Sequence, residues 1–594
     1  MKLRRDSSAG ANPPPVPEPP EEAETADPGS NEAWSDRTRL GDVLVSAHLL
    51  THDQVAEALL EQSSSGKRIG NTLVELGAIS ERDLAQALST QLLVPLVDLS
   101  QQTPSPEAIE SLPESVARAH LAIPIVLDDS GLTIAVADPT PELAKVLANA
   151  CGRVVRLVIA PTSDVQRAID TAYRALGNIH EHVRAFEETA EAPRRAAADT
   201  TVQLAMADNA PVVQVVNLLI TQAMRDRASD IHIEPQGSHL RIRFRIDGAL
   251  HDAVELPLTM APALVSRLKI MADMNIVERR RPQDGQITMV VDNREIDIRV
   301  STVATIWGES CVLRVLDKSR SLFRMGDLGM PIDTHGVFTR LIGAPFGMVL
   351  CAGPTGSGKT TTLYAALTEI DDPSRNIMTI EDPVEYVFPT INQIQTNEQA
   401  GITFANGLRS ILRQDPDVIL VGEIRDVETA RIAVQSALTG HFVLSSLHAT
   451  DSAAALHRFL DMGIESFLVA SSVLAVVSQR LVRRICQTCK TTFEPKDEEL
   501  SFYEESGGKP KSQFFHGEGC NFCAGTGYRD RIGVYELMRI TPEIKRLIVG
   551  WATQEELQRM AVSQGMQTLR DEAIRLIADD VTTISEVIRS IYTA

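Results

Sequence analysis

The sequence predicts an α/β protein built from several domains, and three observations support this class. Its 594 residues exceed the length of one typical domain several times over. Apolar strands alternate with helical patterns between about residues 330 and 480, which is typical of a parallel sheet. Within that region the apolar strand Met348 to Ala352 runs directly into a glycine-rich loop and a helix-like segment.

Composition and charge argue against several function classes. The chain has 57 Lys and Arg against 79 Asp and Glu, a net charge of −22, which disfavours a broad basic face for DNA or anionic lipid. Aromatic residues make up only 4%, which disfavours base-stacking platforms, so a nucleic-acid partner is not expected. There is no apolar run of about 18 residues and no apolar signal core. We therefore expect a cytoplasmic protein that reaches a membrane only through partners.

The N-terminal third contains a tail and an internal repeat. Residues 1–36 hold seven of the 31 prolines and few large apolar residues, which predicts a disordered tail. Arg39 to Gln62 and Arg68 to Gln91 then form a tandem repeat of 24 residues with a five-residue link. Apolar residues recur at helical spacing within both copies, so each copy is expected to contain helices.

Changes in pattern along the chain predict the other boundaries. Strands at 121–126 and 132–136 surround a turn and place an α/β module after the repeat. Leu240 to Ile246 alternates apolar and cationic residues and predicts a half-buried strand. The predicted segments are a tail at 1–36, an N-terminal domain at 37–175, a linker at 176–208, a second domain at 209–330, a P-loop domain at 331–480, a four-cysteine segment at 481–535 and C-terminal helices at 536–594.

The glycine-rich loop fits the pattern G-x-x-x-x-G-K-[ST] of a phosphate-binding P-loop. Backbone N–H groups of such a loop, together with the start of the following helix, favour a bound phosphate. Lys359 can reach the β- and γ-phosphates of ATP, and the Thr360 hydroxyl can ligate Mg²⁺. The predicted ATP-binding residues are Gly353, Pro354, Thr355, Gly356, Ser357, Gly358, Lys359, Thr360 and Thr361.

Acidic residues follow two other apolar strands of the same domain. Asp417 to Glu423 is a Walker-B-like strand, although Gly422 stands where an Asp is usual before the final Glu423. Glu381 to Glu385, which includes Asp382, follows the strand Ile377 to Ile380. Carboxylates at the ends of parallel strands face the ligand crevice, so we expect them to act on Mg²⁺ or on the attacking water.

Two histidines flank the next strand of this domain. His441 precedes the strand Phe442 to Leu447, and His448 follows it. A histidine at the carboxyl end of a strand can sense the γ-phosphate of ATP, but a structural role for His448 is an equal alternative.

Taken together, these motifs resemble the secretion-type hexameric ATPases of the PilB and GspE type, which drive type IV pilus assembly and type II secretion. That family has a Walker A motif, an acidic box, a Walker B motif ending in Gly-Glu and a histidine box, which match Gly353 to Thr360, Glu381 to Glu385, Asp417 to Glu423 and Thr439 to His448. Four further segments match in order: Ser229 to Pro235, Arg245 to Gly248, Arg281 to Gly285 and Asp297 to Thr302.

The resemblance implies a PAS-like domain before a RecA-like domain, a ring of six chains, and an inner-membrane platform protein as partner. It also implies that Arg243 and Arg245 approach the γ-phosphate, where a cation that arrives on closure stabilises the transferred group. The alternative is that these arginines only form the solvent-facing side of a strand and take no part in catalysis. Glu385 and Glu423 compete for the role of polarising the water, and the sequence leaves that choice open.

Four cysteines form two C-x-x-C pairs, Cys486 with Cys489 and Cys520 with Cys523. Two such pairs on a turn-rich segment suit tetrahedral Zn²⁺, and four thiolate ligands leave no open position, so the site is expected to be structural. A disulfide is the weaker alternative in a cytosolic protein. The assembly and export members of the family resemble this chain in having a four-cysteine insert, which retraction ATPases typically lack.

The tandem repeat resembles the MshEN domain, which binds cyclic di-GMP. In that domain each copy has the form R-L-G-x-x-L-x-x-x-G, and the resemblance implies ligand contacts by Arg39, Gly41, Arg68 and Gly70. The second copy keeps Gly77 at the tenth position, whereas the first copy has His48. A helical docking domain that binds a protein partner and no nucleotide is the alternative.

The sequence thus favours a hexameric cytosolic ATPase that powers type IV pilus assembly under the control of cyclic di-GMP. A type II secretion ATPase would carry the same ATPase motifs and is the nearest alternative. A DNA-transport motor disagrees with the net charge, and a nucleotide-gated adaptor disagrees with the complete set of acidic and basic site residues.

Overall fold

The computed structural model describes residues 40–65, 68–99, 102, 104–191, 210–292, 294–317 and 324–592. The predicted tail at 1–36 and the predicted ligand residue Arg39 lie outside the described residues. The chain divides into two compact units, Met1–Ile169 and Asp170–Ala594, and each is described by itself.

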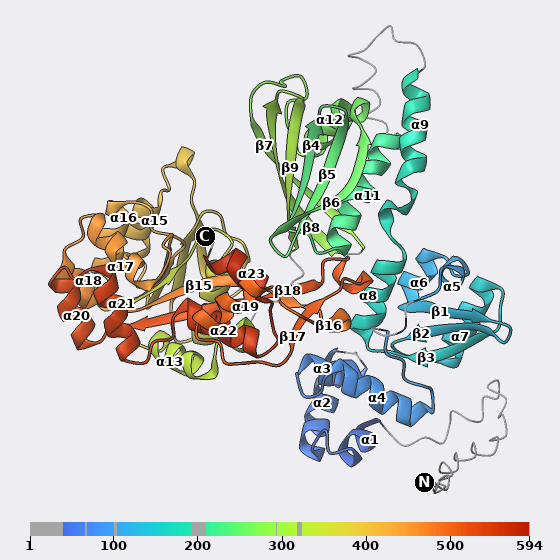
Figure 1. Ribbon diagram of the computed structural model, residues 1–594, viewed down its shortest axis with the longest axis horizontal. Helices are drawn as coiled ribbons and strands as arrows, with labels where there is room; N and C mark the ends of the chain where they lie inside the picture. The colour runs from blue at the N-terminus through green and yellow to red at the C-terminus, as the bar shows by residue number, and fades with distance from the viewer. Residues whose placement is uncertain are drawn as a thin grey trace, which may run out of the picture. The chain divides into compact units, whose positions relative to one another are not determined.

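The tandem repeat folds as two pairs of helices, which confirms the helical prediction (Figure 1). Gly41 and Gly70 lie where two helices pack closely. A Cβ added at Gly41 would lie 2.9 Å from the Val55 side chain, and a Cβ added at Gly70 would lie 2.7 Å from the Leu84 side chain. His48 adopts φ 58°, the left-handed conformation that Gly77 adopts in the second copy at φ 71°, so the substitution preserves the turn. The helices are α1 (Leu40–Ser46), α2 (His52–Ser65), α3 (Ile69–Glu75) and α4 (Glu81–Leu92).

The rest of the first unit is a small α/β module, as predicted. β1 (Ala122–Asp128) pairs antiparallel with β2 (Gly131–Val136), and β2 pairs parallel with β3 (Val155–Ile159). The inward-facing residues of all three strands are apolar, which gives the module its core. Its helices are α5 (Pro106–Glu110), α6 (Glu114–His120), α7 (Pro141–Cys151) and α8 (Thr162–Ala172).

An antiparallel sheet of six strands begins the second unit, in the order β6-β5-β4-β9-β8-β7. Apolar residues on one face of this sheet pack against α11 (Pro211–Arg225) and α12 (Ala261–Met271), which lie alongside the strands in Figure 1. The predicted strand at 240–246 is confirmed, and its apolar residues are the buried ones. The strands are β4 (Asp230–Gln236), β5 (His239–Ile246), β6 (Ala249–Pro257), β7 (Gln283–Val291), β8 (Arg294–Thr305) and β9 (Gly308–Asp317).

The predicted linker at 176–208 contains a packed helix. α9 (Ile179–Glu191) contributes Ile179, Val183 and Phe186 to the core of the antiparallel domain. These residues therefore belong to that domain, whereas residues 192–208 lie outside the described part of the chain.

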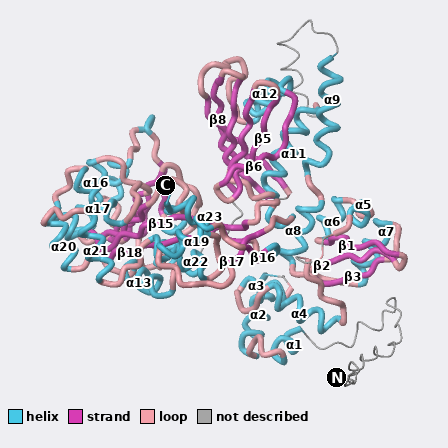
Figure 2. The backbone as a smooth tube through the Cα atoms, in the orientation of Figure 1, coloured by secondary structure: helices cyan, strands magenta, loops and turns pink. Residues whose placement is uncertain are grey.

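A seven-stranded sheet in the order β12-β11-β13-β14-β10-β15-β18 forms the predicted P-loop domain. All its strands are parallel except β18, and helices lie on both sides of the strands in Figure 2. Each face has its own apolar core, because successive residues of the central strands face opposite layers. The strands are β10 (Gly347–Ala352), β11 (Ile377–Glu381), β12 (Asn392–Gln395), β13 (Val418–Val421), β14 (Phe442–Leu447), β15 (Val473–Ile485) and β18 (Tyr528–Arg539).

The helices of this domain follow the βα alternation that the sequence predicted. α14 begins at the P-loop lysine, and the C-terminal helices pack against the sheet. They are α13 (Ile332–Ile342), α14 (Lys359–Ile370), α15 (Phe404–Ile411), α16 (Val427–Leu438), α17 (Ser452–Asp461), α18 (Ser466–Ser472), α20 (Pro542–Val549), α21 (Gln554–Ser563), α22 (Leu569–Ala578) and α23 (Ile584–Val587).

The four-cysteine segment is a connection between two strands of the seven-stranded sheet. β15 and β18 pair from Ala475 with Arg539 to Ile485 with Tyr528, so the predicted boundaries at 480 and 535 each fall inside a strand. Between them lie β16 (Lys490–Phe493), α19 (Asp497–Glu505) and β17 (Phe514–Gly517). None of the helices in the described part of the chain has both the length and the hydropathy of a membrane span.

Candidate ATPase active site

The P-loop joins β10 to α14 in the strand–loop–helix order that phosphate binding requires. Gly353, at φ 153°, leaves no room for a side chain, because a Cβ there would lie 2.4 Å from Ser357 Oγ and 2.7 Å from the carbonyl oxygen of Gln479. The Lys359 ammonium donates to the carbonyls of Gly353 and Pro354, both at 2.9 Å. Burial lowers the pKa of Lys359, whereas Cys351 and then Glu423 oppose that shift.

Gln479 on β15 contacts the backbone of the same loop. It is fully buried, and its Nε2 donates to the carbonyl of Ser357 at 2.7 Å. No local pattern in the sequence points to Gln479, because the contact depends on the parallel pairing of β10 with β15.

A cavity of about 600 Å³ lies over the carboxyl ends of the parallel strands, the usual place for a ligand in such a sheet. It brings together most of the predicted site residues from the P-loop, both acidic segments and the histidine box. Those lining it are Thr355, Gly356, Gly358, Lys359, Thr360, Thr361, Asp382, Glu385, Glu423 and His448.

Glu423, just past the end of β13, has two basic residues beside it in this cavity. His448 Nε2 is 3.4 Å from its Oε2, and Arg425 forms an ion pair with it. Arg425 is also 4.0 Å from Asp382 Oδ2 and so faces both acidic segments. Of the two histidines, His448 reaches the cavity, whereas His441 contacts the Ser436 carbonyl at 3.1 Å and belongs to a turn.

Three arginines that the sequence analysis did not select also line the cavity. They are Arg314 on β9, Arg425 after β13 and Arg531 on β18. Arg299 on β8 lies 3.7 Å from Glu385 Oε1. Two of the four had a signal in the sequence: Arg425 stands two residues after Glu423, and Arg299 lies within the matching segment Asp297 to Thr302.

Arg243 and Arg245 are not among the residues that line the cavity. They lie on the polar face of the six-stranded sheet, where Arg243 donates to both carboxylate oxygens of Glu234 at 2.8 Å. Arg245 Nε lies 3.5 Å from Asp230 Oδ2. A role for these arginines at the γ-phosphate stays a prediction.

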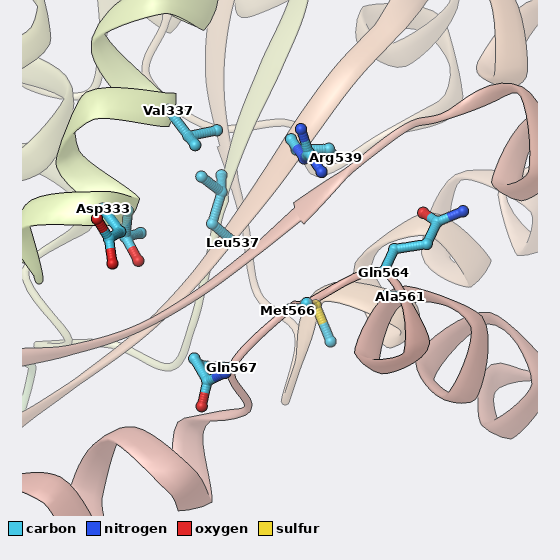
Figure 3. Close-up of a pocket in the computed structure, with 10 residues that line it drawn as sticks. Asp333, Val337, Leu537, Arg539, Ala561, Gln564, Met566 and Gln567 are labelled. Atoms are coloured by element: carbon cyan, nitrogen blue, oxygen red, sulfur yellow. The ribbon is translucent and has the colours of Figure 1, made fainter.

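A smaller cavity of about 250 Å³ lies between α13, β18 and α21 (Figure 3). Leu537 and Arg539 line it, and Arg539 pairs with Ala475 at the amino end of β15. This cavity therefore lies at the amino ends of the parallel strands, whereas the P-loop follows a carboxyl end. No predicted site residue lines it. The phosphate chemistry belongs to the larger cavity.

The four cysteine sulfurs converge at one point, with all four within 4.8 Å of one another. The separations are 3.8 Å for Cys486 to Cys520, 3.9 Å for Cys489 to Cys523 and 3.8 Å for Cys520 to Cys523. Sulfurs around tetrahedral zinc with bonds of about 2.3 Å lie about 3.8 Å apart, so the geometry fits this metal.

Backbone donors also suit thiolates at this site. The N–H groups of Cys520 and Gly527 point at Cys523 Sγ from 3.1 and 3.2 Å, and that of Gly519 points at Cys489 Sγ from 3.4 Å. The hydrogen bond from Cys486 is the main cause that holds the pKa of Cys523 well below its usual value.

In the first unit, Arg68 precedes α3 and forms an ion pair with Asp138. Its side chain remains 65% exposed, so the guanidinium is accessible. Gly41 and Gly70 lie in α1 and α3, where they permit close packing of helices. Ligand contacts by Gly41, Arg68 and Gly70 stay predictions.

Comparisons with known proteins agree with the geometry. The family model described as "Type II/IV secretion system protein" matches residues 205–589, and the "MshEN domain" model matches residues 92–179, just after the tandem repeat. Type IV pilus assembly ATPase PilB of Myxococcus xanthus is 41% identical over 557 residues, which cover 93% of this chain and 98% of that protein.

Two type II secretion proteins are similarly related. HxcR of Pseudomonas aeruginosa is 44% identical over 480 residues, which cover 80% of this chain and 98% of that protein. Type II secretion system protein E of Xanthomonas campestris is 38% identical over 567 residues, which cover 94% and 99%. With the P-loop, the acidic segments and His448 around one cavity, the chain belongs to the type II/IV secretion system protein family and is an ATP hydrolase.

Proposed function

We propose that this ATPase powers the assembly of a type IV pilus, as a ring of six chains at the cytoplasmic face of an inner-membrane platform protein. The observation that carries the proposal is the match to the pilus assembly ATPase of Myxococcus xanthus, which extends over 98% of that protein and includes the N-terminal region. The HxcR match leaves a larger part of this chain uncovered, and protein E of Xanthomonas campestris covers as much of the chain but at the lower identity of 38%. A PAS-like identity for the antiparallel domain is part of the same proposal.

The residues around the cavity divide the work of hydrolysis. Lys359 would hold the β- and γ-phosphates of ATP, and Thr360 with the nearby carboxylates would hold Mg²⁺, which neutralises charge on the phosphates. Glu385 lines the cavity with an exposed carboxylate whose Oε1 lies 3.7 Å from the Arg299 guanidinium, and this carboxylate would orient water. Glu423, held by Arg425 and His448, would act on the metal shell. We therefore favour Glu385 as the residue that polarises the attacking water.

A gene deletion in the host distinguishes the two secretion-family functions. We expect cells without this gene to lose surface pili, and the wild-type gene, but not a Lys359→Ala gene, to restore them. Electron microscopy would count pili, while activity assays of the culture medium would measure secreted enzymes. Normal piliation with lost secretion would instead assign the chain to type II secretion.

We further propose that the N-terminal region binds cyclic di-GMP. The match to the MshEN domain and the 24-residue tandem repeat support this ligand. An exposed guanidinium at Arg68, beside the start of α3, can stack on guanine and pair with phosphate. The left-handed backbone of His48 supports a first half-site of the same shape as the second.

Replacing Arg68 with alanine should weaken cyclic di-GMP binding by about 10- to 100-fold, because a hydrogen bond to a charged group contributes about 1.5–3 kcal/mol. Isothermal titration of the full-length protein would measure the dissociation constant. Arg82→Ala is the matched control, since Arg82 is an exposed arginine of α4 outside the R-L-G motif. If wild-type protein takes up no cyclic di-GMP, the repeat is a partner-docking module.

We also propose that Cys486, Cys489, Cys520 and Cys523 hold a structural Zn²⁺. The support is the tetrahedral spacing of their sulfurs and the backbone N–H groups that face two of them. With four protein ligands the metal would have no open position for catalysis.

A further inference from the structure

A buried carboxylate lies beneath the loop that carries Asp382 and Glu385. Glu381, the last residue of β11, is only 3% exposed. Its Oε1 accepts hydrogen bonds from Thr379 Oγ1 at 2.6 Å and Gln393 Nε2 at 3.2 Å, and its Oε2 accepts one from the Tyr364 hydroxyl. Glu381 also lines the cavity, but neighbouring side chains engage both of its carboxylate oxygens, whereas Glu385 has the Arg299 guanidinium 3.7 Å from its Oε1.

Two of these donors also hold the backbone of the loop. The Tyr364 oxygen accepts the Glu385 N–H at 3.2 Å. Gln393 Oε1 accepts the Phe388 N–H at 2.7 Å, and Gln393 Nε2 donates to the Tyr386 carbonyl at 3.0 Å. Tyr364 and Gln393 thus fix the loop at three backbone groups between Glu385 and Phe388.

Tyr364 also connects this loop to the phosphate-binding loop. It lies on α14, one turn after Thr360, in the helix that begins at Lys359. Its ring packs edge-on against Phe388, with the ring centres 5.2 Å apart. Burial raises the pKa of the Tyr364 hydroxyl, and the Glu381 charge raises it further, so the hydroxyl stays a donor to Glu381.

We propose that Tyr364 and Glu381 are positioning residues for ATP hydrolysis, which hold Glu385 at a fixed distance from the P-loop. The Tyr364 hydroxyl is the link, since it joins a helix anchored at Lys359 to the backbone amide of Glu385. This inference rests on the proposed role of Glu385. A displacement of about 1 Å in a catalytic group can reduce turnover by about 100-fold, so the loss of one such bond has a measurable effect.

Tyr364→Phe tests the link, because it keeps the ring and removes the hydroxyl. We expect kcat for ATP to fall by about tenfold or more while KM changes by less than about threefold. Tyr535→Phe is the matched control, since Tyr535 lies in the same buried core and its hydroxyl donates to the Leu328 carbonyl instead. Should Tyr364→Phe fail to fold, Gln393→Met removes the other anchor of the loop, and the same loss of kcat is expected.

A double variant shows whether Tyr364 acts through Glu385. In the Glu385→Gln background, adding Tyr364→Phe should slow hydrolysis by less than about twofold, because the group that it positions has been replaced. If the double variant instead lost kcat by the product of the two single losses, the two residues would act independently and the inference would be overturned. Wild-type kcat in Tyr364→Phe would also overturn the positioning role of Tyr364, without affecting the proposed role of Glu385. Wild-type turnover in Glu385→Gln would instead reject the role of Glu385 in orienting water.

Discussion

Replacing Lys359 with alanine should abolish ATP hydrolysis, reducing kcat by at least about 100-fold, because the ammonium that offsets charge on the transferred phosphoryl group is removed. The side chain is buried in the P-loop and held by two carbonyls, so its position is fixed before ATP arrives. Phosphate release measured at saturating Mg·ATP gives kcat directly.

Lys509→Ala is the matched control, since Lys509 is an exposed lysine outside the cavity and should retain wild-type turnover. Circular dichroism would establish that both variants are folded. Normal turnover in Lys359→Ala would mean that hydrolysis does not take place at the P-loop.

The second large effect concerns the metal. Cys486→Ser should lower the zinc bound per chain well below that of the wild-type protein, because three thiolates and a water hold the ion less tightly than four thiolates. The connection 486–527 should then lose protection against hydrogen exchange by about tenfold or more. Strand β10 and helix α14 should keep their protection, since both apolar cores that hold them lie outside this connection.

Cys151→Ser provides the control, because Cys151 lies at the end of α7 in the first unit and should leave the zinc content unchanged. Metal analysis and hydrogen-exchange mass spectrometry would be applied to the same samples. Full zinc content and unchanged exchange in Cys486→Ser would contradict a structural zinc site.

Local patterns in the sequence were sufficient for the P-loop. The motif from Gly353 to Thr360 requires a strand before it and a helix after it, and β10 and α14 are found there. Local patterns were also sufficient for the two acidic segments. An apolar run that ends in a carboxylate predicts a buried strand with the carboxylate at the carboxyl end of that strand. The cavity brings these segments together as the parallel sheet requires.

Other features depend on pairings between distant segments, which local periodicity does not encode. The register of β15 with β18 spans the four-cysteine connection, so the domain boundaries at 480 and 535 were placed within strands. The contacts of Gln479 and Tyr364 require β15 and β11 to lie beside their neighbours in one particular register. Helix spacing alone could have placed Tyr364 near Thr360, but nothing local indicates Glu381 as its partner.

The most direct test of this account is phosphate release from Mg·ATP by the purified full-length protein, measured across fractions separated by size. Phosphate release is expected, and it should be concentrated in the largest fraction if the proposed ring of six chains forms and brings Arg243 and Arg245 to the γ-phosphate, since these arginines do not line the cavity of their own chain. Folded protein that releases no phosphate in any fraction would contradict the assignment of ATP hydrolysis to this cavity.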